Sequence, residues 1–165
     1  MFDSKPVMRE WWALESDHSA PPLVVFLMVA DLAVFLDYGH WRLVPALEQP
    51  LLQTLGLALY LAVAIWQTWT DTYLARYFSQ ENRKAVPMDH GPYQYVRHPR
   101  YAAAIVAKAA VALALASVLG WVLAAAWTIV MLRKIAIEEA HLRNVFGTRY
   151  EDYSQRTAKV LPGIY

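Results

Sequence analysis

The chain has 165 residues, which fits one domain, and 58% of them are hydrophobic, above the roughly 45–50% of soluble domains. Its net charge of +1 excludes the strong basic excess of a nucleic-acid-binding protein. The lack of cysteine excludes disulfides, thiolate metal sites and a cysteine nucleophile. Seven Trp and ten Tyr are side chains that favour a membrane–water interface.

Residues 1–20 are the expected interfacial lead-in of a single domain that covers residues 1–165. Trp11 and Trp12 follow the first basic residues, and a polar run from Glu15 to His18 comes next. A cleaved signal peptide would have an apolar core at that place. We therefore expect this segment to lie at a membrane surface.

The first two expected membrane spans occupy residues 21–78. The first runs from Leu23 to Leu36 and is apolar except for Asp31, and the second runs from Leu51 to Trp69 and continues into the interface as far as Phe78. A carboxylate within a span is costly unless it faces other helices. Asp31 is therefore expected either to bond a neighbouring helix or to have a substrate or proton role.

The remaining chain divides into a loop, a helical hairpin and a cap. Residues 79–100 are polar and proline-rich and predict a structured loop, and residues 101–141 are mostly apolar. One straight helix through that apolar part would be roughly 48 Å long, against an apolar membrane core of about 30 Å. We expect a break near Ser117–Gly120, a second helix ending at about His141, and a cap over residues 142–165. The alternatives are one steeply tilted helix or the core hairpin of a soluble protein.

Basic residues are unevenly distributed along these segments. The predicted hairpin turn has none, whereas the loop and the C-terminal segment hold most of them: Arg76, Arg83, Lys84, Arg97, Arg100, Arg133, Lys134, Arg143, Arg149, Arg156 and Lys159. The positive-inside rule then predicts an all-α, polytopic membrane bundle of about four transmembrane helices. Both termini, the loop and the C-terminal segment are expected on the cytoplasmic side of a cytoplasmic (inner) membrane.

Two motifs could carry chemistry on that face. The first is GPYQYVRHPRY, residues 91–101, which combines aromatic rings with the cationic or titratable Arg97, His98 and Arg100. The second contains Glu138 and Glu139, at the expected cytoplasmic end of the last span. A buried carboxylate stays ionised only beside a cation or several donors, so the first motif is a suitable neighbour for the second. Together they match a zwitterionic ligand, and the rings match a purine or a cation.

The ordered pair of motifs resembles the isoprenylcysteine carboxyl methyltransferase family, within a superfamily that includes membrane phospholipid N-methyltransferases. The resemblance rests on GPYQYVRHPRY, an apolar hairpin, and then EEAHLRNVFGTRYEDY with a proline-containing tail, from about Pro87 to the C-terminus. It implies methyl transfer from S-adenosylmethionine to a lipophilic or membrane-associated acceptor. It also implies a cofactor site formed by Tyr93, Tyr95, Val96, Arg97, His98, Pro99, Tyr101, Glu138 and Glu139.

The chain departs from the family pattern at two positions. Similar proteins often carry Gly where this chain has Ala103, and usually carry Arg where it has Lys134, with Arg133 beside it. Lysine keeps the charge but loses the bidentate fork of arginine. The resemblance makes Arg133, Lys134 and His98 the catalytic candidates, His98 either for cofactor contact, for proton transfer or for loop architecture.

No metal site is expected. The Glu138-x-x-His141 spacing occurs in di-iron bundles, but the matching Glu15-x-x-His18 lies in the polar lead-in. Methyl transfer itself needs neither a metal nor an enzyme nucleophile, because it is an in-line displacement that depends on placement of the acceptor. The segment Phe146–Tyr153 is expected to form either an interfacial helix or a lid over the cofactor.

Two other functions compete with methyl transfer. The ending PGIY, residues 162–165, also resembles NADPH-dependent membrane sterol reductases, although an acidic pair would repel a phosphate-rich ligand. A non-catalytic membrane protein on the same scaffold would explain Lys134 and Ala103. The expected partners are the lipid bilayer and a lipophilic, prenylated or lipid acceptor, and no nucleic acid.

Overall fold

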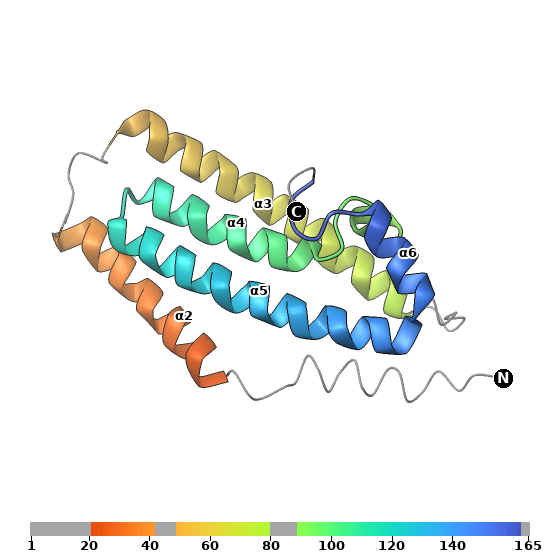
Figure 1. The fold of residues 1–165 in the computed structure, drawn as a ribbon. Coiled ribbons are helices and arrows are strands. Elements are labelled where there is room, and N and C mark those ends of the chain that lie inside the picture. Colours follow the sequence, from red (N-terminus) through yellow and green to blue (C-terminus); the bar gives the residue numbers. More distant parts are fainter. Residues whose placement is uncertain (1–20, 42–48, 80–88, 163–165) are drawn as a thin grey trace. The chain divides into compact units, whose positions relative to one another are not determined.

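The structure, a computed structural model, describes residues 21–41, 49–79 and 89–162, and all elements in these ranges are helical (Figure 1). In chain order they are α2 (Pro21–Leu36), the π-helix η1 (Asp37–Trp41), α3 (Pro50–Ser79), the 3-10 helix η3 (Gly91–Gln94), α4 (Pro99–Ala114), α5 (Val118–Phe146) and α6 (Thr148–Arg156). Within the described ranges, β-pairing is limited to an isolated parallel bridge between Val96 and Ala158. The predicted all-α class is confirmed. The lead-in over residues 1–20 lies outside the described residues.

The chain forms two compact units, each of which contains part of α3, α4 and α5. Of the described residues, the first unit contains 68–79, 89–102 and 133–162, and the second contains 21–41, 49–67 and 103–132. The boundary in α5 falls where its apolar residues give way to Arg133 and the charged residues that follow. The first unit therefore contains both of the motifs that were singled out in the sequence.

The break in the predicted hairpin is confirmed at residues 115–117. α4 ends at Ala114 and α5 begins at Val118, and Ser117 between them is 1% exposed. Its Oγ accepts a 3.0 Å bond from the backbone N–H of Gly120, as an N-cap serine does for the third helical residue. The same hydroxyl donates to the Asp37 carboxylate, which is also buried. The chain therefore forms two helices in place of one long helix. The second helix has a capped start, and a hydrogen bond to Asp37 holds the break in position.

The second helix of the hairpin is longer than the sequence indicated. α5 was expected to end at about His141, but it continues to Phe146. Gly147 has a φ of 55°, a left-handed value that glycine adopts without strain, and this residue separates α5 from α6. The predicted end was wrong because the charged run after Glu139 is compatible with helix, and only the glycine interrupts it.

Close contacts between small residues pack the helices of the second unit. A Cβ on Gly56 in α3 would lie 2.4 Å from the Ala114 backbone N and 2.9 Å from the Ala110 carbonyl O of α4. Ala110 and Ala112 are 0% exposed. Small residues let helix backbones approach in this way, and α3 and α4 are in contact because position 56 has no side chain.

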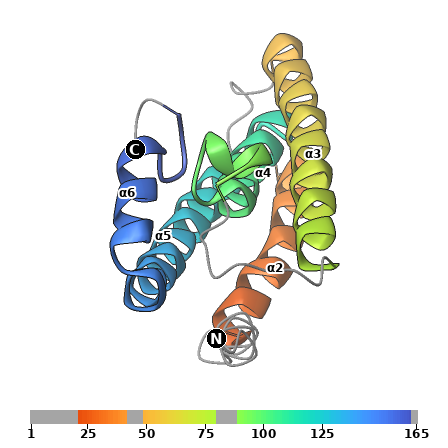
Figure 2. The ribbon, with the colours of Figure 1, turned by 90° about the vertical axis from the view of Figure 1, so that its right-hand side faces the viewer.

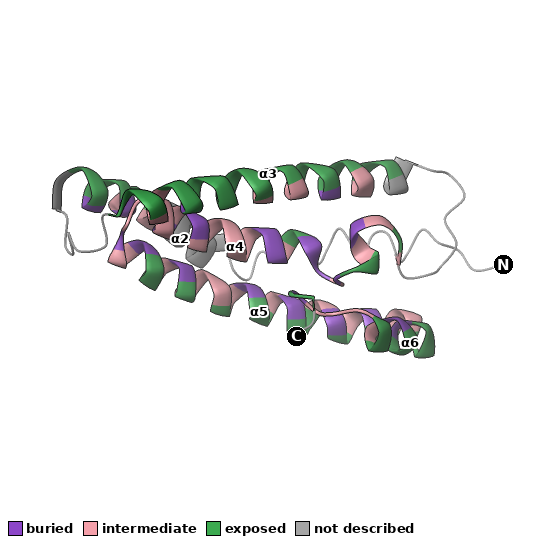
Figure 3. Ribbon diagram, turned by 90° about the horizontal axis from the view of Figure 1, so that it is seen from above, coloured by how far each residue is buried: buried purple, intermediate pink, exposed green. Residues whose placement is uncertain are grey.

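Among the residues that the structure describes, two helices are long and apolar enough to span a membrane: Pro50–Arg76 and Val118–Phe146. α2 and α4 have 16 residues each, about 24 Å of helix. In α3 the large apolar side chains are mostly exposed, with Leu51 at 70% and Ile65 at 73%, as Figure 3 shows along that helix. Soluble monomers rarely leave such a contiguous apolar surface in water. The count of four spans stays a prediction.

α6 folds back beside the end of α5 (Figures 1 and 2). Tyr150 and Tyr153, one face of this nine-residue helix, are 1% and 5% exposed and pack with Leu142 and Phe146 of α5. The spacing of three residues puts both rings on the same side of the helix. This anchoring places the chain that follows α6 beside the loop motif.

Candidate functional site

The loop motif opens with a turn that requires glycine. Gly91 has a φ of 61°, and a Cβ at this position would lie 2.6 Å from the Tyr73 ring of α3. The backbone then forms η3 and reaches Pro99, which begins α4 with its φ already suited to a first helical position. The Ala102 N–H donates to the His98 carbonyl at 2.9 Å. The helix start therefore fixes the positions of Arg97 and His98.

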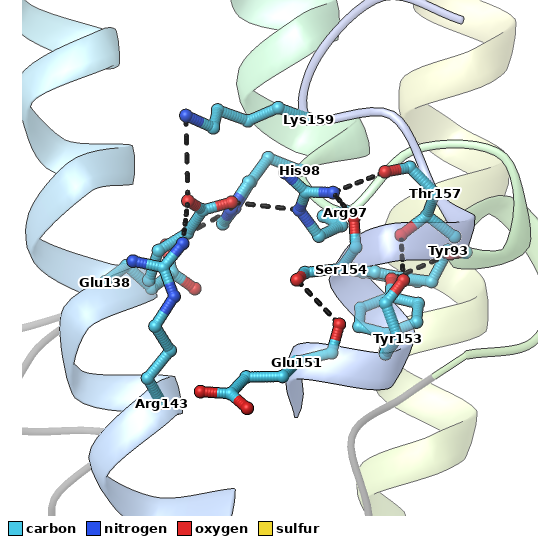
Figure 4. Close-up of polar contacts among 11 residues, drawn as sticks. Tyr93, Arg97, His98, Glu138, Arg143, Glu151, Tyr153, Ser154, Thr157 and Lys159 are labelled. Carbon is cyan, nitrogen blue, oxygen red and sulfur yellow. Dashed lines mark hydrogen bonds and ion pairs between the residues drawn. The ribbon is translucent and has the colours of Figure 1, made fainter. Parts of the chain in front are cut away.

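Arg97 joins the loop to α5, to the end of α6 and to the residue that follows α6 (Figure 4). Its Nε donates to Glu139 Oε1 at 2.9 Å, and its Nη1 donates to the Ser154 carbonyl at 2.6 Å and to the Thr157 carbonyl. The side chains of Arg97 and Glu139 are only 10% and 3% exposed. A planar guanidinium can make these bonds in several directions at once, which an ammonium cannot.

Glu139 is surrounded by cationic and titratable groups. Besides Arg97, its carboxylate lies 3.4 Å from His98 Nε2, 3.4 Å from Arg143 Nη2 and 3.7 Å from Lys159 Nζ. Burying a carboxylate is costly unless it is paired and hydrogen-bonded, and these neighbours meet that requirement. Glu139 is thus an internal tie between loop, helix and tail.

His98 lies between the two glutamates. It is 4% exposed, with Nδ1 3.8 Å from Glu138 Oε2 and Nε2 near Glu139, and its ring is 5.8 Å from that of Tyr101. Despite that proximity, Nε2 is a buried atom without a well-formed hydrogen bond to any described residue. Glu138 is the more accessible carboxylate, with 19% of its side chain exposed. These two side chains retain capacity to bind a polar group.

Hydrogen bonds attach the C-terminal tail, the described residues 157–162 that follow α6, to the loop. The Arg97 N–H donates to the Ala158 carbonyl at 2.8 Å and the His98 N–H to the Lys159 carbonyl at 3.2 Å. The Tyr153 hydroxyl donates to the Tyr93 carbonyl at 2.7 Å. Residues about 60 positions apart are therefore held in register, and the motif cannot move without the tail.

Burial raises the pKa of Tyr150 and of Tyr153 well above the ordinary value of a tyrosine. For Tyr150 the nearby charge of Glu139 acts in the same direction, whereas Arg97 acts against it. The Tyr150 hydroxyl is buried and has no hydrogen-bond partner among the residues that the structure describes. Both rings therefore stay neutral over the range in which proteins usually work.

The structure brings together four of the predicted site residues. Arg97, His98, Glu138 and Glu139 form one cluster, with Val96 and Pro99 buried next to them in the chain and Tyr93 and Tyr101 half-buried. Tyr95 is 53% exposed, Lys134 is half-buried and Arg133 is exposed. Arg100, expected to serve the acidic pair, instead lies 3.1 Å from Asp71 of α3.

Several residues of the cluster were not singled out from sequence. Arg143 carries a local signal, since it lies four positions after Glu139 and so on the same helix face. No local sequence signal marks the other members, which are Lys159, Tyr153 and the carbonyls of Ser154 and Thr157. Their contacts arise only when the tail folds back onto the loop.

The chain is similar to known methyltransferases. The family model of phospholipid methyltransferases matches residues 49–149. Methanethiol S-methyltransferase 1 of Bradyrhizobium diazoefficiens is 28% identical over 98% of this chain, and methanethiol S-methyltransferase of Mycobacterium tuberculosis is 25% identical over 93%. A probable protein-S-isoprenylcysteine O-methyltransferase of Oryza sativa subsp. indica is 32% identical over 56% of this chain.

A solved structure has the same fold. The eukaryotic intramembrane Ras methyltransferase (isoprenylcysteine carboxyl methyltransferase) aligns with a TM-score of 0.61 and 24% identity, over 89% of this chain and 54% of that one. The chain spans 56%, 68% and 48% of the three curated relatives named above. The family match covers well over half of the sequence and includes both motifs of the cluster, and the chain belongs to the phospholipid methyltransferase family.

Proposed function

We propose that the protein is an integral membrane methyltransferase that uses S-adenosylmethionine and a lipophilic or membrane-associated acceptor with a carboxylate, thiol or amine. The observation that carries the proposal is the cluster in which His98 lies between Glu138 and Glu139 and Arg97 bonds Glu139 at 2.9 Å. The two sequence motifs that define the resemblance therefore form one site. The three curated relatives named above are all methyltransferases, which agrees with the proposal.

The side chains of the cluster fit such a ligand. S-adenosylmethionine offers an ammonium, a carboxylate, ribose hydroxyls and a purine ring. Glu138, partly exposed, is suited to an ammonium or a hydroxyl. The rings of Tyr95 and Tyr101 are suited to a purine or the sulfonium. Glu139 is already paired with protein cations, so its role is to position Arg97 and His98.

When bound, S-adenosylmethionine supplies an electrophilic methyl group on a sulfonium. The task of the chain is then to hold the acceptor in line with it and to exclude water, which is where most of the acceleration of a displacement arises. His98 is placed to accept a proton from a thiol or an ammonium acceptor, since Glu138 and Glu139 flank its two ring nitrogens. A carboxylate acceptor would need no such step.

Of the two catalytic candidates on α5, Lys134 is better placed than Arg133. It lies four residues before Glu138, so both project from the same helix face, and it is half-buried whereas Arg133 is exposed. We assign Lys134 to the acceptor, as a point charge that would attract a carboxylate or a thiolate.

The electrostatic objection to a nicotinamide cofactor is weaker in the structure than in the sequence. Glu139 faces Arg97, Arg143 and Lys159, so the acidic pair does not by itself repel a phosphate-rich ligand. Membership of the methyltransferase family, and not local charge, favours the sulfonium donor over the reductase alternative.

Calorimetry on the purified protein in detergent tests the proposal. We expect saturable binding of S-adenosylmethionine and of its demethylated product, and no comparable binding of NADPH. Mass spectrometry should then detect methyl transfer to one of a panel of thiols, prenylcysteines and phospholipid amines. Donor binding without turnover on any acceptor would favour the non-catalytic alternative, and preference for NADPH would overturn the proposal.

A further inference from the structure

A second polar cluster lies in the other compact unit, away from both sequence motifs in the chain. Asp31 of α2 and Lys108 of α4 form an ion pair between Oδ2 and Nζ. The Lys108 ammonium lies 5.0 Å from the centroid of the Trp127 ring of α5. Three helices, α2, α4 and α5, thus contribute one polar group each to a single place.

The pair is partly open, which a pure packing contact between helices would not require. The side chains of Asp31 and Lys108 are 30% and 23% exposed. Ionisable groups within apolar spans are costly and usually mark a functional site. A helix-packing ion pair is stabilised when it is sealed by neighbours, whereas an accessible one can exchange partners with a ligand.

The hydrogen-bonding capacity of the cluster is unfilled among the described residues. The Trp127 Nε1 atom is buried and has no hydrogen-bond partner there. Within the same described ranges, the only polar partner of the Lys108 ammonium is Asp31 Oδ2, so Asp31 Oδ1 and further N–H groups of Lys108 are left over. An orphaned indole N–H beside a partly open ion pair is an independent sign that a ligand atom belongs here.

These leftover groups specify the ligand's chemistry. Two donors, from Lys108 and Trp127, and one acceptor, Asp31 Oδ1, match a neutral group that both donates and accepts, such as a hydroxyl or a thiol. An anion would meet the Asp31 carboxylate, and a cation would meet Lys108. The exposed apolar side chains of Val29, Leu32 and Phe35 on α2 suit an otherwise apolar molecule. We propose that Asp31, Lys108 and Trp127 bind the hydroxyl or thiol of a lipophilic molecule.

The proposal stands on the second unit alone and does not rest on methyl transfer. Protein labelled with 15N-tryptophan in phosphatidylcholine nanodiscs has seven indole signals, one per tryptophan, and the W127F variant identifies the Trp127 signal. The probes are decanol, decanethiol, decyl methyl ether and decane, which share an apolar chain. Decanol or decanethiol should shift the Trp127 indole proton saturably, and the arm that shifts it more shows which head group is preferred.

The variants assign each contact. D31N and K108M should each weaken binding by about tenfold or more, as expected for loss of a charge-assisted bond. The ether, which accepts but does not donate, should bind more weakly and respond to K108M but not to D31N. T54V is the control, because the Thr54 hydroxyl is exposed on α3 and bonds only its own helix, and it should change nothing.

Dispersion of the other six indole signals shows that each variant is folded. Equal shifts with decane and decanol would overturn the proposal, as would native affinity in both D31N and K108M. If K108M does not fold, the comparison of alcohol with ether in the native protein still decides the question.

Discussion

Arg97 and Glu139, 42 residues apart in sequence, are joined by a 2.9 Å bond from Nε to Oε1 while both are almost fully buried. Because Nη1 of the same arginine also reaches the Ser154 and Thr157 carbonyls, this one side chain holds the loop, α5 and the tail together. Removal of this side chain should therefore lower stability as well as ligand binding.

Replacement of Arg97 by lysine should lower stability by about 3 kcal/mol, since breaking a buried pair leaves Glu139 with fewer donors and two carbonyls without partners. Thermal unfolding of the purified protein in detergent, followed by circular dichroism, measures the effect. The control is Arg156→Lys, because Arg156 is exposed and bonds only the Asp152 carbonyl of its own helix. A shift of similar size in both variants would show that Arg97 has no special role.

Glu138 and Glu139 should respond differently to replacement by glutamine. Glu139→Gln should cost about 3 kcal/mol or more of stability, because Arg97 and its neighbours would lose a buried counter-charge. Glu138→Gln should leave the melting temperature nearly unchanged but weaken S-adenosylmethionine binding by about tenfold in calorimetry. Equal melting temperatures for the two variants would contradict the division of roles.

Gly56→Ala should destabilise the protein by about 1–3 kcal/mol, a typical cost of overpacking. The new methyl group would lie 2.4 Å from backbone N and 2.8 Å from Cα of Ala114, and backbone cannot rotate away as a flexible side chain can. Gly39→Ala is the matched control, because a Cβ there meets nothing within 4 Å. Chemical denaturation of both variants in the same detergent compares them.

Stability should fall in alkaline solution because of Tyr150 and Tyr153. Burial raises their pKa in the folded state, so the stability that comes from keeping them neutral is complete below the unfolded value of about 10 and is lost as the pH rises through the folded value. Tyr150→Phe should reduce this loss without a cost at neutral pH, since its hydroxyl has no partner in the described chain.

Tyr153→Phe is the informative counterpart. It should also reduce the alkaline loss, but at neutral pH it should cost about 1 kcal/mol, because the bond to the Tyr93 carbonyl disappears. Melting temperatures measured from neutral to strongly alkaline pH distinguish the two variants. Identical pH profiles for both variants and the native protein would show that neither ring titrates in the folded state as argued.

The proposed membrane topology can be read directly, because the chain contains no cysteine and single-cysteine variants have no background. A membrane-impermeant maleimide added to intact cells should label Gln49→Cys, at the exposed start of α3, but not Asp152→Cys on the exposed face of α6. Labelling of Asp152→Cys should appear after the cells are opened. The reverse pattern would place the cluster outside the cytoplasm.

The composition and apolar runs of this sequence were sufficient to predict an all-α fold and a break near Ser117–Gly120, close to the observed start of α5 at Val118, because span length is a local property. The pairing of the loop motif with Glu138 and Glu139 was predictable too, since buried carboxylates need cations. The sequence did not show which of the two carboxylates is paired with the cations. Only the tertiary structure shows that Glu139 is enclosed by Arg97, His98, Arg143 and Lys159 while Glu138 stays accessible.

The contacts of the tail with the loop and the Asp31–Lys108 ion pair likewise depend on the tertiary structure. Lys159 and Tyr153 reach the loop only because α6 turns back at Gly147, and Asp31 meets Lys108 across 77 positions. Contacts between distant residues depend on how the helices pack, and neither period nor composition encodes that packing locally. The sequence by itself therefore determined which residues could act, and the packing of the chain decided which of them meet.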